Sequence, residues 1–294
     1  MLSATTKLRK NPIGYWEVVE KRSEAELQDY YFRKYYQKAK GSCEHEYTAE
    51  ELSYFRAEIS QRWSVIKKYV STTGSILDVG CGEGYTIAFF RKLGWKVKGL
   101  DYSRSGIEGK NPECSDALIT GDIFQLLRQE GILKNRYDVI WLQNVLEHVI
   151  DPVRLLESLR SIVPPREMLL VTVPNDFSDI QLYALDRGLV DSEFWVALPD
   201  HLNYFSIDSL KNIGAVTGWA DIEILSDFTI NWFLYHPGSN YVKVKSAGKP
   251  AHIARVELEN LFNNRPVEDV VNFWSALAKI GMGRDLTAFF LTSS

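Results

Sequence analysis

Short apolar runs alternate with amphipathic stretches along the middle of the chain. The apolar runs predict buried strands at residues 76–79, 97–100, 117–120, 137–142 and 168–173. Between them, apolar positions at spacings of three and four predict helices at residues 85–93, 123–130 and 152–162. Strands that alternate with helices in this way predict a doubly wound, mostly parallel sheet.

An amphipathic helix precedes the first of these strands. The segment "TAEE" from Thr48 has the Ser/Thr-x-x-Glu form of a capping box, and apolar residues recur at spacings of three and four from Leu52 to Val70. We expect this helix to end by Gly74. Further toward the N-terminus, "LQDYYFRKYYQKAKG" places aromatic residues where they could line one side of a helix. These patterns predict an N-terminal helical arm or lid over residues 1–72.

The alternation changes after residue 173. Residues 175–205 form an insertion, followed by a helix capped by Ser206 and stopped by Gly218. A sixth strand is expected at 221–228 and a last one at 285–291, separated by an unusually long segment at 231–284. The pattern thus predicts one α/β domain, residues 73–294, with a second, helical insertion at 231–284.

Composition narrows the function classes. A chain of 294 residues with 45% hydrophobic content can bury a full α/β core, and a net charge of -4 offers no electrostatic footprint for nucleic acid. The three cysteines, Cys43, Cys81 and Cys114, match neither a disulfide framework nor a metal site, which indicates a reducing compartment. No apolar run is long enough to span a membrane. We therefore expect a soluble, cytoplasmic protein.

The stretch "SILDVGCGEGYTIAFFRKLG", Ser75 to Gly94, carries the first candidate site. A dinucleotide loop has the form G-x-G-x-x-G, which would require a third glycine where this chain has Tyr85. The loop is instead G-x-G-x-G, preceded by Asp78. A carboxylate at this position is a poor neighbour for a pyrophosphate and suits an amino group, while the N-terminus of the next helix favours an anion.

The segment "LDVGCGEG" resembles motif I of the class I S-adenosylmethionine-dependent methyltransferases. The resemblance implies a seven-stranded Rossmann-like sheet, S-adenosyl-L-methionine as cofactor and S-adenosyl-L-homocysteine as product. It also implies that Asp101 in "VKGLDYS" binds the ribose hydroxyls and that Asp122 in "ALITGDIF" reads the adenine amino group. With the fourth-strand motif "YDVIWLQNVLEHV", the cofactor contacts that it implies are Asp78, Gly80, Cys81, Gly82, Gly84, Asp101, Tyr102, Asp122, Ile123 and Gln143.

Two histidines are candidate proton acceptors, because each follows a predicted strand at the expected ligand edge and imidazole titrates near neutral pH. They are His148 in "LEHVIDP" and His201 in "LPDHLNYFS". These segments resemble the ubiquinone-pathway methyltransferases, and some related enzymes bind a divalent metal through Glu-x-x-Glu-His and a further His. Here Asn144 replaces the first Glu, so we expect no metal and favour an acid/base or pocket-lining role, with more weight on His201. Glu147 is expected to cap a helix or orient a neighbour.

The acceptor is less sharply indicated. Aromatic residues gather outside the cofactor motifs, and the chain resembles methyltransferases of polysaccharide and secondary-metabolite pathways. We expect methyl transfer to an O or N atom of a small molecule, such as a sugar, glycan or secondary metabolite. A nicotinamide-dependent oxidoreductase is an alternative that the missing third glycine disfavours. A catalytically inactive, cofactor-binding regulatory or scaffold protein is another, which only an activity measurement can dismiss; the sequence leaves the oligomeric state open.

Overall fold

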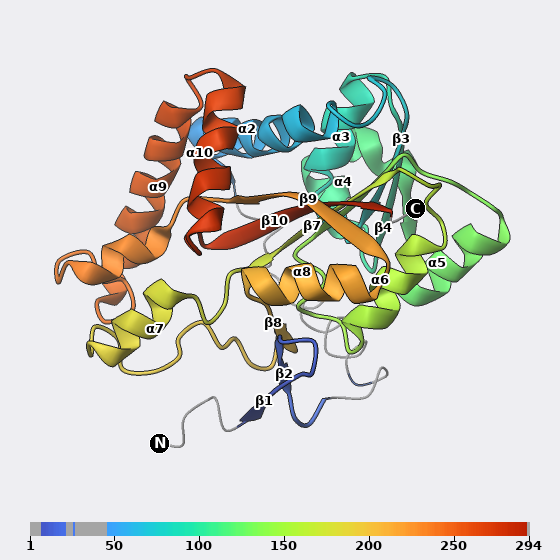
Figure 1. The fold of residues 1–294 in the computed structure, drawn as a ribbon. Helices are drawn as coiled ribbons and strands as arrows, with labels where there is room; N and C mark the ends of the chain where they lie inside the picture. The colour runs from blue at the N-terminus through green and yellow to red at the C-terminus, as the bar shows by residue number, and fades with distance from the viewer. Residues whose placement is uncertain (1–6, 22–25, 27–45, 293–294) are drawn as a thin grey trace.

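A seven-stranded sheet forms the centre of the protein. The computed structural model describes residues 7–21, 26 and 46–292 (Figure 1). The strand order is β5-β4-β3-β6-β7-β10-β9, and β10 pairs antiparallel with both β7 and β9 whereas the other pairs are parallel. The strands are β3 (Ser75–Val79), β4 (Lys96–Asp101), β5 (Leu118–Thr120), β6 (Val139–Gln143), β7 (Met168–Pro174), β9 (Trp219–Ser226) and β10 (Asp285–Thr292). The predicted doubly wound, mostly parallel sheet is confirmed.

Helices cover both faces of this sheet, in the two layers that Figure 1 shows above and below it. One apolar core joins the sheet to α5 (Ile123–Ile132), α6 (Pro152–Arg160) and α8 (Ile207–Val216). A second core joins the opposite face to α2 (Ala49–Ile66), α3 (Tyr85–Lys92) and α10 (Val267–Lys279). Strands β3, β6 and β7 in the middle of the sheet are buried almost throughout, which explains why they read as continuous apolar runs, whereas two of the three residues of β5 at the edge are exposed.

Helix α2 begins where the sequence predicts. The Thr48 side chain accepts from the Glu51 backbone N–H while the Glu51 carboxylate accepts from the Thr48 N–H, so the predicted capping box is present. The helix ends at Ile66, earlier than the expected limit at Gly74, and hydrogen-bonded turns continue the chain to Val70.

The N-terminal region contains strands that the sequence analysis did not anticipate. β1 (Leu8–Lys10) and β2 (Trp16–Val18) form an antiparallel hairpin, and β2 pairs with β8 (Asn203–Tyr204) at the end of the first insertion. These segments are too short for periodicity to separate them from loop. The aromatic stretch "LQDYYFRKYYQKAKG" lies outside the described residues, so its predicted helix stays a prediction.

The second insertion is largely helical, whereas the first contains a single helix among turns and loops. The first contains α7 (Asp179–Asp186), and the second contains 3-10 turns η4 (Ile230–Tyr235) and η5 (Lys245–Ala247), α9 (Gly248–Phe262) and α10. α10 buries Trp274 against the sheet, so this part of the second insertion belongs to the core. A short helix α4 (Ser105–Lys110) and the turn η3 (Pro112–Ala117) connect β4 to β5. Among the described helices, none combines the length and apolar character needed to cross a membrane.

Candidate functional site

The glycine loop lies at the carboxyl end of β3, where ligands bind in open α/β sheets. Gly80, Gly82 and Gly84 all have positive φ. A Cβ at Gly80 would lie 2.3 Å from Val145 Cγ2, so the close packing of this turn also requires glycine there. A Cβ at Gly82 would meet nothing within 4 Å, which leaves the backbone of this position open to a ligand.

Asp101 connects the glycine loop to the end of the neighbouring strand β4. Its Oδ2 accepts from the Gly82 N–H at 2.8 Å, and its Oδ1 accepts from the Ser103 N–H at 2.9 Å. Each carboxylate oxygen can accept more than one hydrogen bond. Asp101 therefore shapes the loop and retains acceptor capacity for a ligand hydroxyl.

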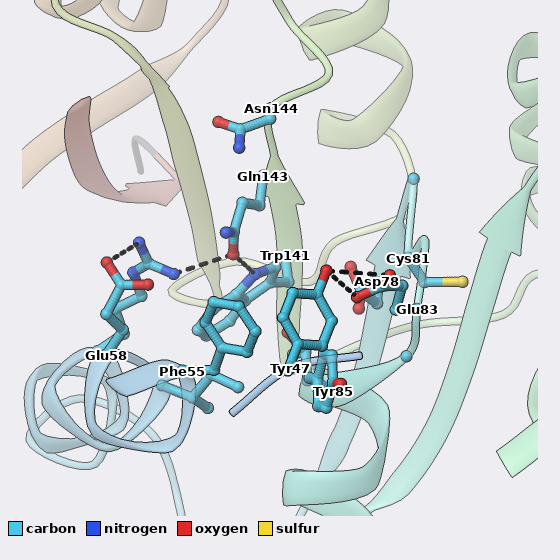
Figure 2. A pocket seen from close by; sticks show the side chains of 15 residues that line it. Tyr47, Phe55, Glu58, Asp78, Cys81, Glu83, Tyr85, Trp141, Gln143 and Asn144 are labelled. Carbon is cyan, nitrogen blue, oxygen red and sulfur yellow. Dashed lines mark hydrogen bonds and ion pairs between the residues drawn. The ribbon is translucent and has the colours of Figure 1, made fainter. Parts of the chain in front are cut away.

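A cavity of about 360 Å³ lies between the glycine loop and helix α2 (Figure 2). Of the predicted cofactor contacts, it is lined by Asp78, Gly80, Cys81, Gly84 and Gln143. The Cys81 sulfur points away from the other labelled side chains in Figure 2. Burial raises the pKa of the Cys81 thiol, which supports its interpretation as a spacer between glycines and not as a nucleophile.

The Asp78 carboxylate is the acidic wall of this cavity. The side chain is 3% exposed, and its pKa is raised well above the ordinary value, first by burial and then by the Asp101 carboxylate. A buried carboxylate is stabilised in its charged form by a nearby cation. The position therefore fits the ammonium group of an amino-acid ligand.

The remaining predicted contacts lie beyond this cavity, at the ends of β4 and β5. Tyr102 donates its hydroxyl to Asp122 Oδ2 at 3.2 Å, while Asp122 Oδ1 accepts from the Gln125 N–H and caps α5. Ile123 is 5% exposed and packs in the core, so it offers little surface to an adenine ring. The structure thus places Tyr102 and Asp122 together and places Ile123 mainly in the protein interior.

Sequence reasoning missed Arg62, which lines the same cavity from α2. Its Nη1 donates to Gln143 Oε1 at 2.9 Å, its Nη2 lies 3.8 Å from Glu58 Oε1, and its side chain is only 8% exposed. The signal was available, because Arg62 follows Ile59 by three residues and precedes Ile66 by four, on the apolar stripe of the predicted helix. A cation at such a position needs a partner inside the protein.

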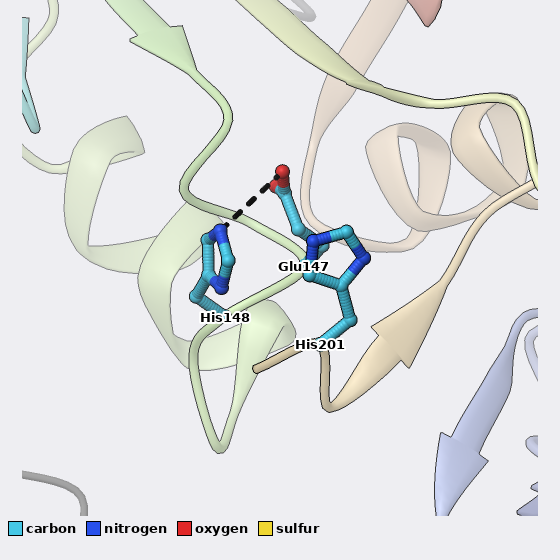
Figure 3. A group of neighbouring side chains, drawn as sticks. All are labelled: Glu147, His148 and His201. Carbon is cyan, nitrogen blue, oxygen red and sulfur yellow. Dashed lines mark ion pairs between the residues drawn. The ribbon is translucent and has the colours of Figure 1, made fainter. Parts of the chain in front are cut away.

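His148 and His201 meet although they come from different loops (Figure 3). Their ring centroids are 4.9 Å apart and nearly perpendicular, and His148 Nε2 lies 3.7 Å from Glu147 Oε1. The other nitrogen of His148, Nδ1, is 2.9 Å from the backbone oxygen of Asp200. When Nδ1 carries the proton and donates it to this oxygen, Nε2 holds a lone pair near Glu147.

These three side chains also have the geometry of a possible metal site. One ligand atom from each of Glu147, His148 and His201 lies within 4.8 Å of the others, and imidazole with carboxylate suits several divalent cations. Asn144 lines the cofactor cavity instead of completing this group. The expected absence of a metal therefore stays a prediction, with these residues as the alternative.

A further polar pair, which sequence reasoning also missed, lies near Glu147. Asp176 is 1% exposed, and neither of its carboxylate oxygens has a hydrogen-bond partner among the described residues. Arg284 Nη1 lies 3.8 Å from Asp176 Oδ1. Burial raises the pKa of Asp176 to about 7, and Asp176 and Arg284 in turn influence the pKa of the buried Glu147. Asp176 follows β7, so its position after a strand was the available signal.

Comparison with known proteins assigns the family. A family model described as a methyltransferase domain matches residues 45–224, which is more than half of the chain. The chain belongs to the class I S-adenosylmethionine-dependent methyltransferases. The cofactor of this family is S-adenosylmethionine, and the positive-φ glycine loop, the open Gly82 backbone and the buried Asp78 of this chain fit its amino-acid end.

Curated relatives of this chain include two ubiquinone biosynthesis O-methyltransferases. The protein from Histophilus somni is 29% identical over 110 residues, which cover 35% of this chain and 46% of that relative. The protein from Colwellia psychrerythraea is 28% identical over 167 residues, which cover 55% of this chain and 65% of that relative. The matched part thus spans about half to two thirds of the length of these relatives.

Solved structures share the fold of this chain. A SAM-dependent methyltransferase from Archaeoglobus fulgidus aligns with a TM-score of 0.51 at 18% identity, covering 90% of this chain and 99% of that one. The 1,6-didemethyltoxoflavin-N1-methyltransferase of Burkholderia thailandensis, solved with 1,6-didemethyltoxoflavin and S-adenosylhomocysteine, aligns with a TM-score of 0.53 at 11% identity, covering 98% and 100%. At these identities the likeness concerns the fold.

Proposed function

We propose that this protein transfers a methyl group from S-adenosylmethionine to an O or N atom of a small molecule. The observation that carries the proposal is the shared cavity of Asp78 and Arg62 beside the glycine loop. The amino-acid end of the cofactor is a zwitterion. A buried carboxylate and a buried guanidinium in one cavity match its ammonium and carboxylate groups.

Each remaining part of the cofactor site has a proposed role. We assign the ammonium group of the cofactor to Asp78 and its carboxylate group to Arg62. The open backbone of Gly82 allows the part of the cofactor between these groups to approach closely. Asp101 accepts from the ribose hydroxyls, and Asp122 with Tyr102 forms the polar end for adenine. Bound in this way, the cofactor supplies an electrophilic methyl group on a sulfonium.

The protein's remaining task is to align the acceptor and remove its proton. In-line displacement depends mainly on positioning, and a weak nucleophile such as a hydroxyl also needs a base. We assign this role to the His148 and His201 pair, with Asp200 fixing His148 through its backbone oxygen. Glu147 lies beside His148, and its carboxylate, when ionised, stabilises the imidazolium that forms as the proton is accepted.

The acceptor that we propose is polar, as a sugar, glycan or hydroxylated secondary metabolite would be. Glu147 Oε2 and both Asp176 oxygens are buried without hydrogen-bond partners in the described part of the chain, and such groups cost free energy until they are paired. Hydroxyl or amino groups of an acceptor would supply the missing donors. We further propose that three segments cover the acceptor side of the site. They are the N-terminal arm, residues 1–72, and the insertions at 175–205 and 231–284 of the main domain, residues 73–294.

An assay with labelled cofactor tests the function. The protein is incubated with [methyl-14C]S-adenosylmethionine and, separately, 3,4-dihydroxybenzoate, methyl glucopyranoside and benzylamine as a ring hydroxyl, a sugar hydroxyl and an amine. Label transferred to one of these compounds, and lost in the His148→Ala/His201→Ala variant, supports the proposal. If wild-type protein binds the cofactor but transfers label to no compound in a wider panel of these three classes, a non-catalytic, cofactor-binding function replaces it.

A further inference from the structure

A buried charged network joins α9 of the second insertion to α2. Arg255 Nε donates to Glu259 Oε1 at 3.0 Å, and its Nη2 donates to the Tyr54 hydroxyl and lies 3.6 Å from Asp227 Oδ2. The Arg255 guanidinium also packs over the Tyr54 ring at 5.0 Å. Arg255 is thus the point where side chains from α2, α9 and the end of β9 meet.

This network lies directly behind the cofactor cavity. A small internal void of about 10 Å³, roughly the room that one water needs, is lined by Glu58, Arg62, Asp227 and Glu259 among others. Glu58 and Arg62 also line the 360 Å³ cavity beside the glycine loop. These two residues of α2 therefore form a wall that faces the cofactor on one side and the network on the other.

Arg62 lies between Gln143 on one side and the carboxyl groups of the network on the other. On the cofactor side it donates to Gln143, whereas on the other side Glu58, Asp227, Glu259 and Asp285 place four carboxyl groups around the void. Burial raises the pKa of Asp227 to about 7 and that of Glu259 to about 8. Arg255 is near Glu58, Asp227 and Glu259 and neutralises part of their charge.

We propose that Arg255 is a positioning residue of the cofactor site, because it balances the carboxyl groups behind α2 and so keeps Arg62 directed toward Gln143 and the cofactor carboxylate. Without Arg255, Glu58 and those of the other carboxyl groups that ionise lack a counter-ion, and the Arg62 guanidinium, which lines the same void, turns toward them. Unpaired buried charges are strongly unfavourable, which supplies the driving force for this movement. The inference rests on the proposed role of Arg62 in binding S-adenosylmethionine.

Two ligands distinguish positioning of Arg62 from general loss of structure. S-adenosylhomocysteine carries the amino-acid end, whereas 5′-methylthioadenosine contains the adenosine and sulfur without it. Calorimetry on Arg255→Met should show S-adenosylhomocysteine binding weakened about tenfold or more, as for loss of a charge-assisted hydrogen bond, and 5′-methylthioadenosine binding unchanged. Combining Arg255→Met with Arg62→Met should add little to the loss in Arg62→Met alone, because both changes act through one contact.

Matched variants complete the test. His252→Ala removes another α2–α9 contact, the 2.9 Å pair with Glu51, and should leave the ratio of the two affinities at its wild-type value. Adding Glu259→Gln to Arg255→Met removes one carboxylate and should restore binding of S-adenosylhomocysteine. If Arg255→Met does not fold, Arg255→Gln keeps a hydrogen-bond donor without the charge and should give the same selective loss.

The outcomes separate the two proposals. Wild-type protein that binds neither ligand contradicts the proposed function itself. Wild-type protein that binds both, with an unchanged affinity ratio in folded Arg255→Met or Arg255→Gln, overturns the positioning role of Arg255. An equal loss of both ligands also overturns it, since this would indicate a general effect on the fold.

Discussion

His148 and His201 stand with their rings nearly perpendicular and 4.9 Å apart, although 52 residues separate them in the chain. Their loops are joined by main-chain contacts, since the Leu202 N–H donates to the Glu147 backbone oxygen at 2.8 Å. The first insertion is therefore attached to the loop after β6. This attachment brings two imidazole groups to one place at the carboxyl edge of the sheet.

Replacing His148 and His201 by alanine, one at a time, shows which of the two is the general base. Loss of the base should lower turnover by about 10²–10⁴-fold with nearly unchanged affinity for S-adenosylhomocysteine, whereas loss of a pocket-lining histidine should mainly raise the KM of the acceptor. Steady-state kinetics with the acceptor found in the labelled assay measures both effects. Full turnover in both single variants and in the double variant would exclude this pair from catalysis.

Treatment with a chelator tests the metal alternative at Glu147, His148 and His201. If the pair acts only as a base, EDTA followed by dialysis leaves turnover unchanged and Mg²⁺ or Mn²⁺ adds nothing. Loss of activity with EDTA and its return with the ion would contradict our expectation that the site holds no metal. In that case Glu147→Gln should abolish the return, because a ligand of the ion would be lost.

Asp101→Ala should weaken binding of S-adenosylhomocysteine by about 10- to 150-fold, the effect of losing a hydrogen bond to a charged group. Two causes act together, because the carboxylate is proposed to hold the ribose and also accepts from the Gly82 N–H in the glycine loop. Calorimetry measures the affinity. Asp116→Ala, at an exposed carboxylate paired with Arg91, is the control, and equal affinities in the two variants would remove Asp101 from the site.

Cofactor affinity should increase with pH through the titration of Asp78. Burial and Asp101 raise the pKa of Asp78 in the free protein, while an ammonium group bound beside it favours the ionised form. Binding therefore releases a proton when the pH lies below this raised pKa, and affinity improves as the pH rises. Calorimetry in buffers of different ionisation enthalpy detects the proton, and Asp78→Asn should abolish its release. Proton uptake in the wild-type protein would contradict the assignment.

Asp176→Asn should stabilise the free protein at pH 8. The pKa of Asp176 is about 7 in the folded protein against an ordinary value of 3.8, so ionisation favours the unfolded state and stability falls as the pH rises from about 4 to about 7. The maximum gain is about 4 kcal/mol, since three pKa units correspond to that free energy. Denaturant unfolding at pH 4 and pH 8 measures it. A variant that is less stable at pH 8 would show that the Arg284 contact outweighs burial.

The sheet could be predicted from the sequence because most of its strands are short apolar runs separated by amphipathic helices. The predicted bounds of β3, β7 and β10 differ from the observed ones by a residue or less at each end. The hairpin of β1 and β2 could not be predicted, because three-residue strands have no measurable period and depend on β8, which lies about 190 residues away.

The site residues that could be predicted are those that come at or just after the strands of the sheet. Asp78, Asp101 and Asp122 each come at or just after a strand, so parallel pairing brings them to one edge. Arg62 and Arg255 lie on helices, and their approach to this edge depends on how α2 and α9 pack. The contact of Asp176 with Arg284 likewise depends on the antiparallel insertion of β10 beside β7, which joins residues more than 100 positions apart.

Titration of the wild-type protein with S-adenosylhomocysteine and, separately, with NADH distinguishes an S-adenosylmethionine site from a dinucleotide site. We expect S-adenosylhomocysteine to bind with one-to-one stoichiometry, Arg62→Met and Asp78→Asn to weaken this binding, and NADH not to compete. Tight binding of NADH together with no heat from S-adenosylhomocysteine would contradict this expectation.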